Sequence, residues 1–265
     1  MAATEQPLVV NRRHMPFELD GGVAPRAAIG LIVLATDNTI EHEFRQIVPR
    51  VEGAAVFHTR ILNDPDINEE TLRAMEGRIA DCARTLRPGE RIDVVAYGCT
   101  SASMVIGPAG VAARVHEGGR PEVPVTNPVS AATTGLAAMG ATRVALLTPY
   151  IDEVNQGMRR FFIGQGLEVP VMGSFNHPDD NEVARISESS IEDALVELGS
   201  HDDVDGVFIS CTSLRVCGIV ERVEQRLGKP VTSSNHALAW HALRLAGVDE
   251  PLDGLGRLFR TPLPG

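Results

Sequence analysis

The fold is decided by two similar stretches, RIDVVAYGCTS (91–101) and VDGVFISCTS (204–213). Each starts with a short apolar, β-rich run and ends in Cys-Thr-Ser. A continuously apolar run of this length is typical of a strand buried on both faces of a parallel sheet. The two cysteines, Cys99 and Cys211, lie 112 positions apart (211 − 99). Both stretches therefore predict a buried strand that delivers a thiol at its carboxyl end.

The rest of the chain continues the alternation of short apolar runs and longer amphipathic ones. Further strands are predicted at 28–34, 143–147, 168–172 and 230–232, and helices at 68–86, 151–165, 182–198, 214–227 and 235–245. In the first of these helices, apolar residues recur every three or four positions, which forms one helical face. Repeated β-then-α units specify parallel sheets with helices on both faces, so the predicted fold class is α/β.

An internal repeat accompanies this alternation. A shift of 112 positions lays residues 32–36 over 144–148, and the tripeptide Pro-Val-Thr occurs at both 124–126 and 230–232. We infer two pseudo-symmetric, Rossmann-like (flavodoxin-like) lobes with the active site between them, outside the carboxyl ends of the strands. The predicted organisation is an N-terminal extension (1–26), a first lobe (27–127 with 234–265) and a second lobe (128–233).

Composition excludes several classes of protein. The 265 residues include 24 Lys and Arg against 35 Asp and Glu, a net charge of −11 that argues against nucleic-acid and anionic-membrane surfaces. No apolar run reaches the ~20 residues that span a bilayer, and the first 26 residues lack the apolar core of a secretory signal. The four cysteines form no CxxC pair and no zinc spacing, so reduced thiols, a cytoplasmic location and a metal-free site are expected.

The repeated Cys-Thr-Ser corner suggests a chemistry. Each thiol is expected just before a helix, whose free N–H groups and dipole would lower the thiol pKa. The hydroxyls that follow, with the first N–H groups of the helix, would bind a carboxylate: Thr100, Ser101, Thr212 and Ser213. Two thiols on opposite sides of one anion could move a proton between its faces, or one could attack while the other protonates. Neither route needs a cofactor.

Other polar residues have simpler interpretations. Cys82 and Cys217 lie on predicted helix faces and are expected to be small buried residues. His236 and His241 are five positions apart, a poor metal spacing on a helix, and are expected to be structural. Arg215 follows the second Cys-Thr-Ser and could pair with a substrate carboxylate. The Thr and Ser residues of both corners could also serve as helix N-caps.

Five segments carry a resemblance to the aspartate/glutamate racemase superfamily, and within it to the maleate cis-trans isomerase and arylmalonate decarboxylase group: 34–39, 97–101, 147–150, 180–185 and 210–214. The resemblance implies a cofactor-independent isomerase of a small (di)carboxylate. In this role Cys99 would be the nucleophile and Cys211 the acid/base. Asn38, Tyr150 and Asn181 would hold the carboxylates, together with the Cys-Thr-Ser corners.

The resemblance also separates branches of the group. The presence of both cysteines argues against a decarboxylase of the arylmalonate kind, which keeps only the thiol of the second lobe. The residues around Asn38 and after Cys211 are most similar to a branch associated with ectoine utilisation, so the substrate need not be maleate. A homo-oligomer is expected from the resemblance and from the N-terminal extension.

Two alternatives remain open at this point. The first is an amino-acid racemase of the aspartate/glutamate type that works by two-base proton transfer. It needs a group that binds the ammonium, and Asp37, beside Asn38, is the obvious acidic residue. The second is a non-catalytic, carboxylate-binding regulatory protein, which would show ordinary thiol pKa values.

Overall fold

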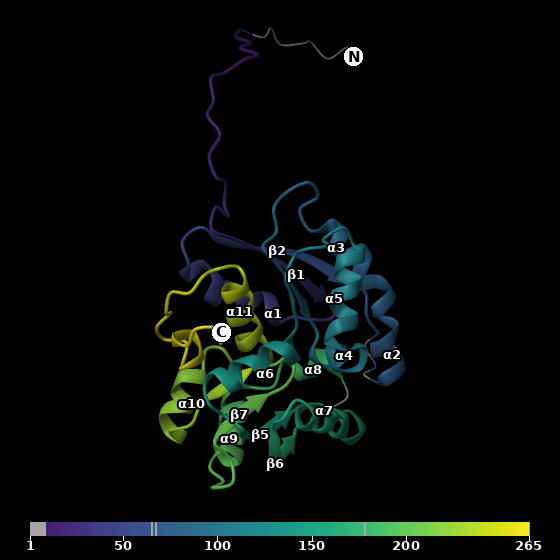
Figure 1. Cartoon of the computed structure of the whole chain (residues 1–265), viewed down its shortest axis with the longest axis vertical. Coiled ribbons are helices and arrows are strands. Elements are labelled where there is room, and N and C mark those ends of the chain that lie inside the picture. The colour runs from purple at the N-terminus through teal and green to yellow at the C-terminus, as the bar shows by residue number, and fades with distance from the viewer. Residues whose placement is uncertain (1–8, 65, 67, 178, 265) are drawn as a thin grey trace, which may run out of the picture.

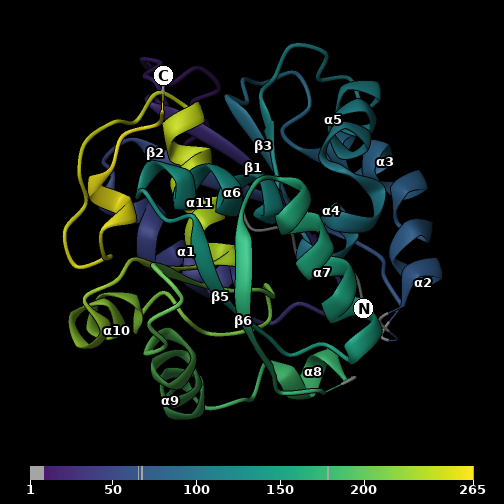
Figure 2. The ribbon, with the colours of Figure 1, turned by 60° about the horizontal axis from the view of Figure 1, so that its bottom comes forward.

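Each lobe is built on a four-stranded parallel sheet (Figure 2). The computed structural model describes residues 9–64, 66, 68–177 and 179–264. The first sheet has the order β2-β1-β3-β4, with strands β1 (Ala27–Leu34), β2 (Ala54–Ile61), β3 (Val94–Gly98) and β4 (Val125–Thr126). The second has the order β6-β5-β7-β8, with strands β5 (Arg143–Thr148), β6 (Glu168–Ser174), β7 (Gly206–Ile209) and β8 (Val231–Ser233). The equivalent order confirms the predicted α/β fold with two similar lobes.

Helices cover both sheets (Figure 1). The first part of the chain supplies α1 (Ile40–Ile47), α2 (Glu69–Ala74), α3 (Ile79–Thr85), α4 (Thr100–Ile106), α5 (Pro108–Glu117) and α6 (Pro128–Ala138). The second part supplies α7 (Asp152–Gly164), α8 (Asp180–Val183), α9 (Glu188–Gly199), α10 (Val220–Leu227) and α11 (Ser234–Leu245). Single 3₁₀ turns occupy Val48–Arg50, Glu76–Arg78 and Leu258–Arg260. The last helix, α11, packs against α6 and against strands β1 and β3 of the first sheet.

The core explains why the central strands were predictable. All eight residues of β1 and all five of β3 are buried, as expected for strands covered on both faces. One apolar cluster runs through both lobes and includes the fully buried Trp240 of α11. Because this core is continuous, the division of the chain at residues 127 and 233 stays a prediction.

Two predicted helices are broken in the structure, and one strand is additional to the prediction. The helix predicted over 68–86 is broken into α2, a 3₁₀ turn and α3; Asn68 does cap its start, but Gly77 lies in the tighter turn. The helix predicted over 182–198 is two helices, since Ser187 caps a new one, α9. Strand β2 was not predicted, because it is an edge strand of mostly half-buried residues without regular alternation.

The fourth difference concerns the second thiol. The helix predicted to begin at Leu214 starts only at Val220, so residues 212–219 form a loop. We call residues 211–217 the Cys211 loop. Cys211 therefore does not precede a helix, and the expected effect of a helix N-terminus is wrong at this corner.

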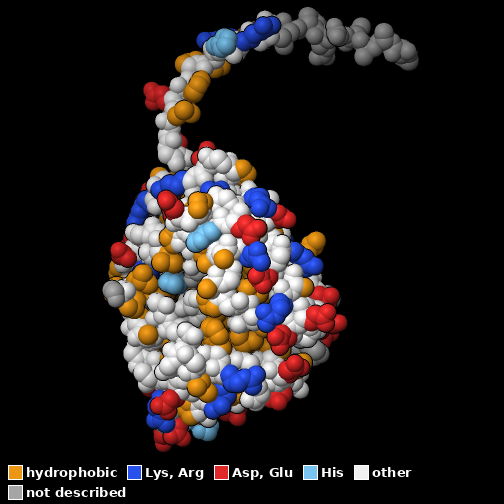
Figure 3. Space-filling model, turned by 45° about the vertical axis from the view of Figure 1, so that its right-hand side comes forward, with side chains coloured by type: hydrophobic (Ala, Val, Ile, Leu, Met, Phe, Trp, Pro, Cys, Tyr) orange, Lys and Arg blue, Asp and Glu red, His pale blue; other side chains and the backbone are white. Residues whose placement is uncertain are grey.

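Within the predicted N-terminal extension (1–26), residues 9–23 run away from the two lobes (Figures 1 and 3). Their apolar side chains are exposed, among them Val9, Phe17 and Leu19. Residues 1–8 lie outside the described part. Among the described residues, no helix has the length and apolar character needed to cross a bilayer.

Candidate active site

Both thiols of the Cys-Thr-Ser corners line one narrow cavity between the lobes. Its volume is about 30 Å³, room for one or two water molecules. Cys99 is 3% exposed and Cys211 is 6% exposed. The first lobe contributes Leu34, Asn63, Asp64, Asp66, Thr71, Leu72, Met75, Cys99, Thr100 and Ser101, and the second contributes Tyr150, Asp180, Cys211 and Thr212. Sequence-predicted residues of both lobes thus meet at the ends of β3 and β7.

The first corner is organised by a helix, as predicted. Cys99 is the N-cap of α4, and its Sγ accepts a hydrogen bond from the N–H of Ala102 at 3.4 Å. The Ser103 hydroxyl donates to the Cys99 carbonyl at 2.5 Å, which fixes the first turn of the helix. The thiol therefore lies at the point where the free N–H groups of α4 converge.

The second corner has a different backbone. Cys211 has φ = +142°, a conformation that costs a non-glycine residue free energy and that is often found at functional sites. Its Sγ accepts a hydrogen bond from the N–H of Ser213 at 3.4 Å. Ser234 joins the two corners, because its Oγ accepts the N–H of Cys211 at 3.0 Å and the hydroxyl of Thr100 at 2.8 Å.

Burial is the largest influence on the pKa of both thiols. It raises the pKa of Cys99 to about 12, against the opposing hydrogen bonds from Ala102 and Ser101. Burial also raises the pKa of Cys211, and the carboxyl of Asp180 raises it further. The expectation of a lowered pKa is therefore wrong, and both sulfurs are protonated at neutral pH.

Tyr150 lies against the second thiol. Burial, followed by the nearby Cys211, raises the pKa of the Tyr150 phenol well above its ordinary value. Its hydroxyl oxygen accepts a hydrogen bond from Ser210 at 3.4 Å. The phenol is a neutral group at the cavity wall that can donate a hydrogen bond to a substrate carboxylate.

Asp180 is a cavity residue that the sequence did not single out. Its carboxyl is buried, which raises its pKa, and it accepts hydrogen bonds from Thr36 at 2.9 Å and Ser213 at 2.7 Å. Since Thr36 belongs to the first lobe and Ser213 to the second, Asp180 ties the lobes together beside the thiols. The resemblance identified its neighbour Asn181 as a candidate. The local sequence contains no feature that predicts that the Asp180 carboxyl lines the cavity.

The two asparagines meet, but outside the cavity. Asn38 Nδ2 lies 3.4 Å from Asn181 Oδ1, across the two lobes. Both side chains line a wider depression next to the cavity, together with Arg215. The guanidinium of Arg215 donates to the Ile186 carbonyl at 3.0 Å, so this residue faces the depression and not the thiols.

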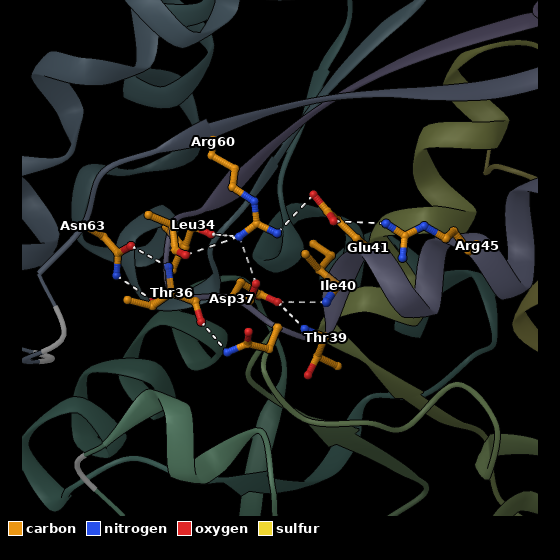
Figure 4. Close-up of polar contacts among 11 residues, drawn as sticks. Leu34, Thr36, Asp37, Thr39, Ile40, Glu41, Arg45, Arg60 and Asn63 are labelled. Carbon is orange, nitrogen blue, oxygen red and sulfur yellow. Dashed lines mark hydrogen bonds and ion pairs between the residues drawn. The ribbon is translucent and has the colours of Figure 1, made fainter.

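The loop that carries Asn38 is held by two charged residues (Figure 4). Arg60 donates to the carbonyls of Leu34, Ala35 and Asp37 at 3.0–3.3 Å. The buried Asp37 carboxyl accepts the N–H groups of Thr39 and Ile40 at 2.7 and 2.8 Å. Asp37 is therefore engaged with its own loop and is not among the residues that line the cavity.

The remaining candidates have structural contacts. His236 is buried between the Thr232 hydroxyl and the Leu255 carbonyl, and burial lowers its pKa to about 4. His241 Nδ1 is hydrogen-bonded to the Thr126 hydroxyl. Cys217 is buried, as predicted, whereas Cys82 is half-buried.

Comparison with known proteins agrees with this geometry. A family model described as arylmalonate decarboxylase matches residues 29–259. The maleate isomerase of Nocardia farcinica is 29% identical over 241 residues, which cover 88% of this chain and 95% of the relative. The arylmalonate decarboxylase of Bordetella bronchiseptica is 37% identical over 139 residues, 52% of this chain and 58% of the relative.

Solved structures resemble the whole fold. A cysteine-to-serine mutant of Nocardia farcinica maleate cis-trans isomerase, with a covalently bound succinylcysteine intermediate, superposes with a TM-score of 0.81 at 27% identity, covering 88% of this chain and 98% of that one. A liganded arylmalonate decarboxylase with glycine-to-cysteine and cysteine-to-serine changes gives 0.79 at 29% identity, with 88% and 99% covered. Since the family model covers most of the chain, the protein is an enzyme of the arylmalonate decarboxylase family, with maleate isomerases among its relatives.

Proposed function

We propose that the protein isomerises a small cis-dicarboxylate of the maleate type to its trans isomer, with Cys99 as nucleophile and Cys211 as acid/base. The observation that carries the proposal is the pair of thiols, one from each lobe, on the wall of one narrow cavity. The succinylcysteine intermediate of the Nocardia isomerase supports it, because such an adduct is the product of thiol addition to a double bond.

The chemistry begins with addition. The sulfur of Cys99 bonds to one alkene carbon, and Cys211 delivers a proton to the adjacent carbon. The proton that leaves Cys99 replaces the one given by Cys211, so that one S–H bond adds across the double bond overall. This balance suits a site in which both sulfurs are protonated at rest.

Elimination completes the reaction. The former double bond is now a single bond, and rotation about it places the carboxylates trans. As the C–S bond breaks, the Cys99 sulfur takes back the proton that it gave to Cys211, and Cys211 removes the proton from the carbon that received it, so that both thiols are restored. Tyr150 and the hydroxyl of Thr212 would hold the carboxylates, while Ser101, Ser213 and Thr100, whose hydroxyl donates to Ser234, support the corners. Asn38 and Asn181 would bind a substrate carboxylate at the mouth of the cavity.

A decarboxylase reaction is less well supported. The arylmalonate decarboxylase structure with a glycine replaced by cysteine points to a relative that lacks one of two thiols, whereas this chain carries both.

Proton NMR in D₂O tests the proposal. The protein is incubated with maleate, and a new fumarate signal is the expected result. We expect Cys99→Ala and Cys211→Ala to abolish turnover with the fold intact, and Cys82→Ser, at a half-buried thiol outside the cavity, to keep it. Near-wild-type turnover in both alanine variants would refute the two-cysteine mechanism.

Amino-acid racemisation is the second candidate, and the composition of the cavity wall favours it. Three carboxyls line the cavity, Asp64, Asp66 and Asp180, and among its described lining residues there is no Lys, Arg or His. Carboxyls complement an ammonium group. D- and L-aspartate and glutamate therefore belong to the NMR panel, where deuterium incorporation at the α-carbon would indicate racemisation.

The finer biological setting is also a proposal. The resemblance to the ectoine-utilisation branch adds ectoine-derived acids to the panel of substrates. The exposed apolar side chains of residues 9–23 support a homo-oligomer in which this segment packs on another copy. A cytoplasmic location agrees with four free cysteines. Thermal shifts with a carboxylate but no turnover of any acid would indicate a regulatory protein instead.

A further inference from the structure

The Cys211 loop must be held by something other than a helix. At the first corner, the free N–H groups of α4 converge on Cys99, but the chain after Cys211 stays irregular until Val220. The loop also contains the positive φ of Cys211, which needs surrounding contacts to persist. The question is which residue supplies these contacts.

Ser234 and Asp180 hold the start of the loop, at the Cys211 N–H and the Ser213 hydroxyl, and the contacts at its far end come from Glu43 of α1, which is in the other lobe. Its Oε1 accepts the N–H groups of Val216 and Cys217 at 2.5 and 2.7 Å. Its Oε2 accepts the side-chain amide of Asn235 at 2.7 Å, and the same amide donates to the Thr212 carbonyl at 2.7 Å. One carboxyl group thus accepts two backbone N–H groups at the far end of the Cys211 loop and, through Asn235, is linked to the Thr212 carbonyl near its start.

Burial of the Glu43 carboxyl group costs free energy. The residue is 1% exposed, and burial raises its pKa, while the Cys217, Asn235 and Val216 donors oppose that shift. No Lys, Arg or His side chain within the described residues pairs with it. A buried carboxyl without a cation is rare in a core and is expected to have a specific use.

We propose that Glu43 is a positioning residue that, through Asn235, holds the Cys211 loop so that the second thiol faces the cavity. The inference rests on the proposed function of Cys211 as acid/base. Glu43 touches neither thiol cavity nor substrate; it acts through the backbone of residues 212–217. Its removal therefore affects Cys211 and spares Cys99, which has its own support in α4.

Glu43→Gln is the informative change, because both carboxyl oxygens accept N–H groups. Whichever way the new amide is turned, its NH₂ group faces at least one N–H donor. Glu224→Gln is a matched control. Glu224 is also buried, and its two oxygens accept the backbone N–H groups of Val231 and Arg257. The same chemical change is thereby made away from the thiols.

Two readouts are needed. A short iodoacetamide pulse at alkaline pH, followed by peptide mass spectrometry, measures the alkylation rates of Cys99 and Cys211 separately. In Glu43→Gln we expect Cys211 to be alkylated roughly tenfold faster or more, as lost hydrogen bonds to a charged group imply, with the Cys99 rate unchanged. We expect kcat for the NMR-identified substrate to fall with little change in KM.

Asn235→Ala is a second test of the same inference, which is needed if the Glu43 variant does not fold. It removes the amide that links Glu43 to the Thr212 carbonyl without changing the charge, and the same selective increase at Cys211 is expected. Equal acceleration of alkylation at both thiols would overturn the inference, and so would the same alkylation rates in the Glu43 and Glu224 variants. Either result would show a general loss of packing and not a specific effect on the Cys211 loop. If wild-type protein turns over none of the acids while the selectivity at Cys211 holds, the proposed reaction fails and the positioning role stands.

Discussion

Asp37 gives the stability of this protein a pH dependence that can be calculated. Its carboxyl is 1% exposed and accepts two backbone N–H groups at the start of α1. Burial raises its pKa from 3.8 to about 6, against the opposing hydrogen bonds of Ile40, Thr212 and Thr39. A shift of roughly two pKa units corresponds to about 3 kcal/mol.

The sign follows from the two states. The unfolded chain loses the Asp37 proton near pH 4, whereas the folded protein keeps it up to about pH 6. Between these values the folded state binds more protons, so the free energy of unfolding falls as pH rises. The contribution is complete below the unfolded pKa, and about 3 kcal/mol is lost by the time the pH exceeds the folded pKa.

Asp37→Asn removes the titration and keeps an oxygen that can accept both N–H groups. Urea unfolding of wild type and variant at several pH values measures the difference in unfolding free energy, and the subtraction cancels the other carboxyls. We expect the difference to change by about 2 kcal/mol between pH 4 and pH 6, and by about 3 kcal/mol over a range that extends beyond both pKa values, in favour of the variant at the higher pH. A difference that is independent of pH would refute the reasoning.

Three further predictions concern the site. Asp180→Asn removes a carboxyl that raises the pKa of both cavity thiols, so their alkylation, followed against pH, should start at lower pH; an unchanged profile would contradict this. Arg60→Met frees the carbonyls of the loop that carries Asn38, and steady-state kinetics should show KM rising roughly tenfold, whereas a fall in kcat alone would argue against it. Gly98→Ala places a Cβ 2.7 Å from a neighbouring isoleucine and 3.0 Å from a backbone oxygen, and should lower the unfolding free energy by about 1–3 kcal/mol in urea. Gly77→Ala meets nothing within 4 Å and is its control; equal losses would refute the steric argument.

The sequence predicted those elements whose burial is uniform. Strands β1 and β3 are apolar because both faces are covered, so their pattern is unambiguous. Strand β2 lies at the edge of the sheet and mixes exposed and half-buried residues, including His58 and Arg60, so that no period of two was visible. An edge strand is defined by the absence of a neighbour, which the local sequence does not record.

The two Cys-Thr-Ser motifs show the same limit at the site. Their identical letters predicted identical corners, yet only the first is followed directly by a helix. In place of a helix, the second corner has Glu43, which lies 168 positions before Cys211 (211 − 43) and accepts the N–H groups of Val216 and Cys217. The thiol pKa values were mispredicted for a related reason, since the depth of burial between two lobes is a property of the assembled fold.

The narrowness of the cavity has a consequence for isotopes. With room for only one or two water molecules, the hydrogen that Cys211 gives to carbon has few partners with which to exchange before it is taken back. Enzyme equilibrated in D₂O would place solvent deuterium on the substrate in its first turnover. Elimination that takes back the same atom leaves no deuterium in the product, whereas removal of the hydrogen originally on that carbon leaves one, so the deuterium content of the product would record which of the two hydrogens Cys211 removes.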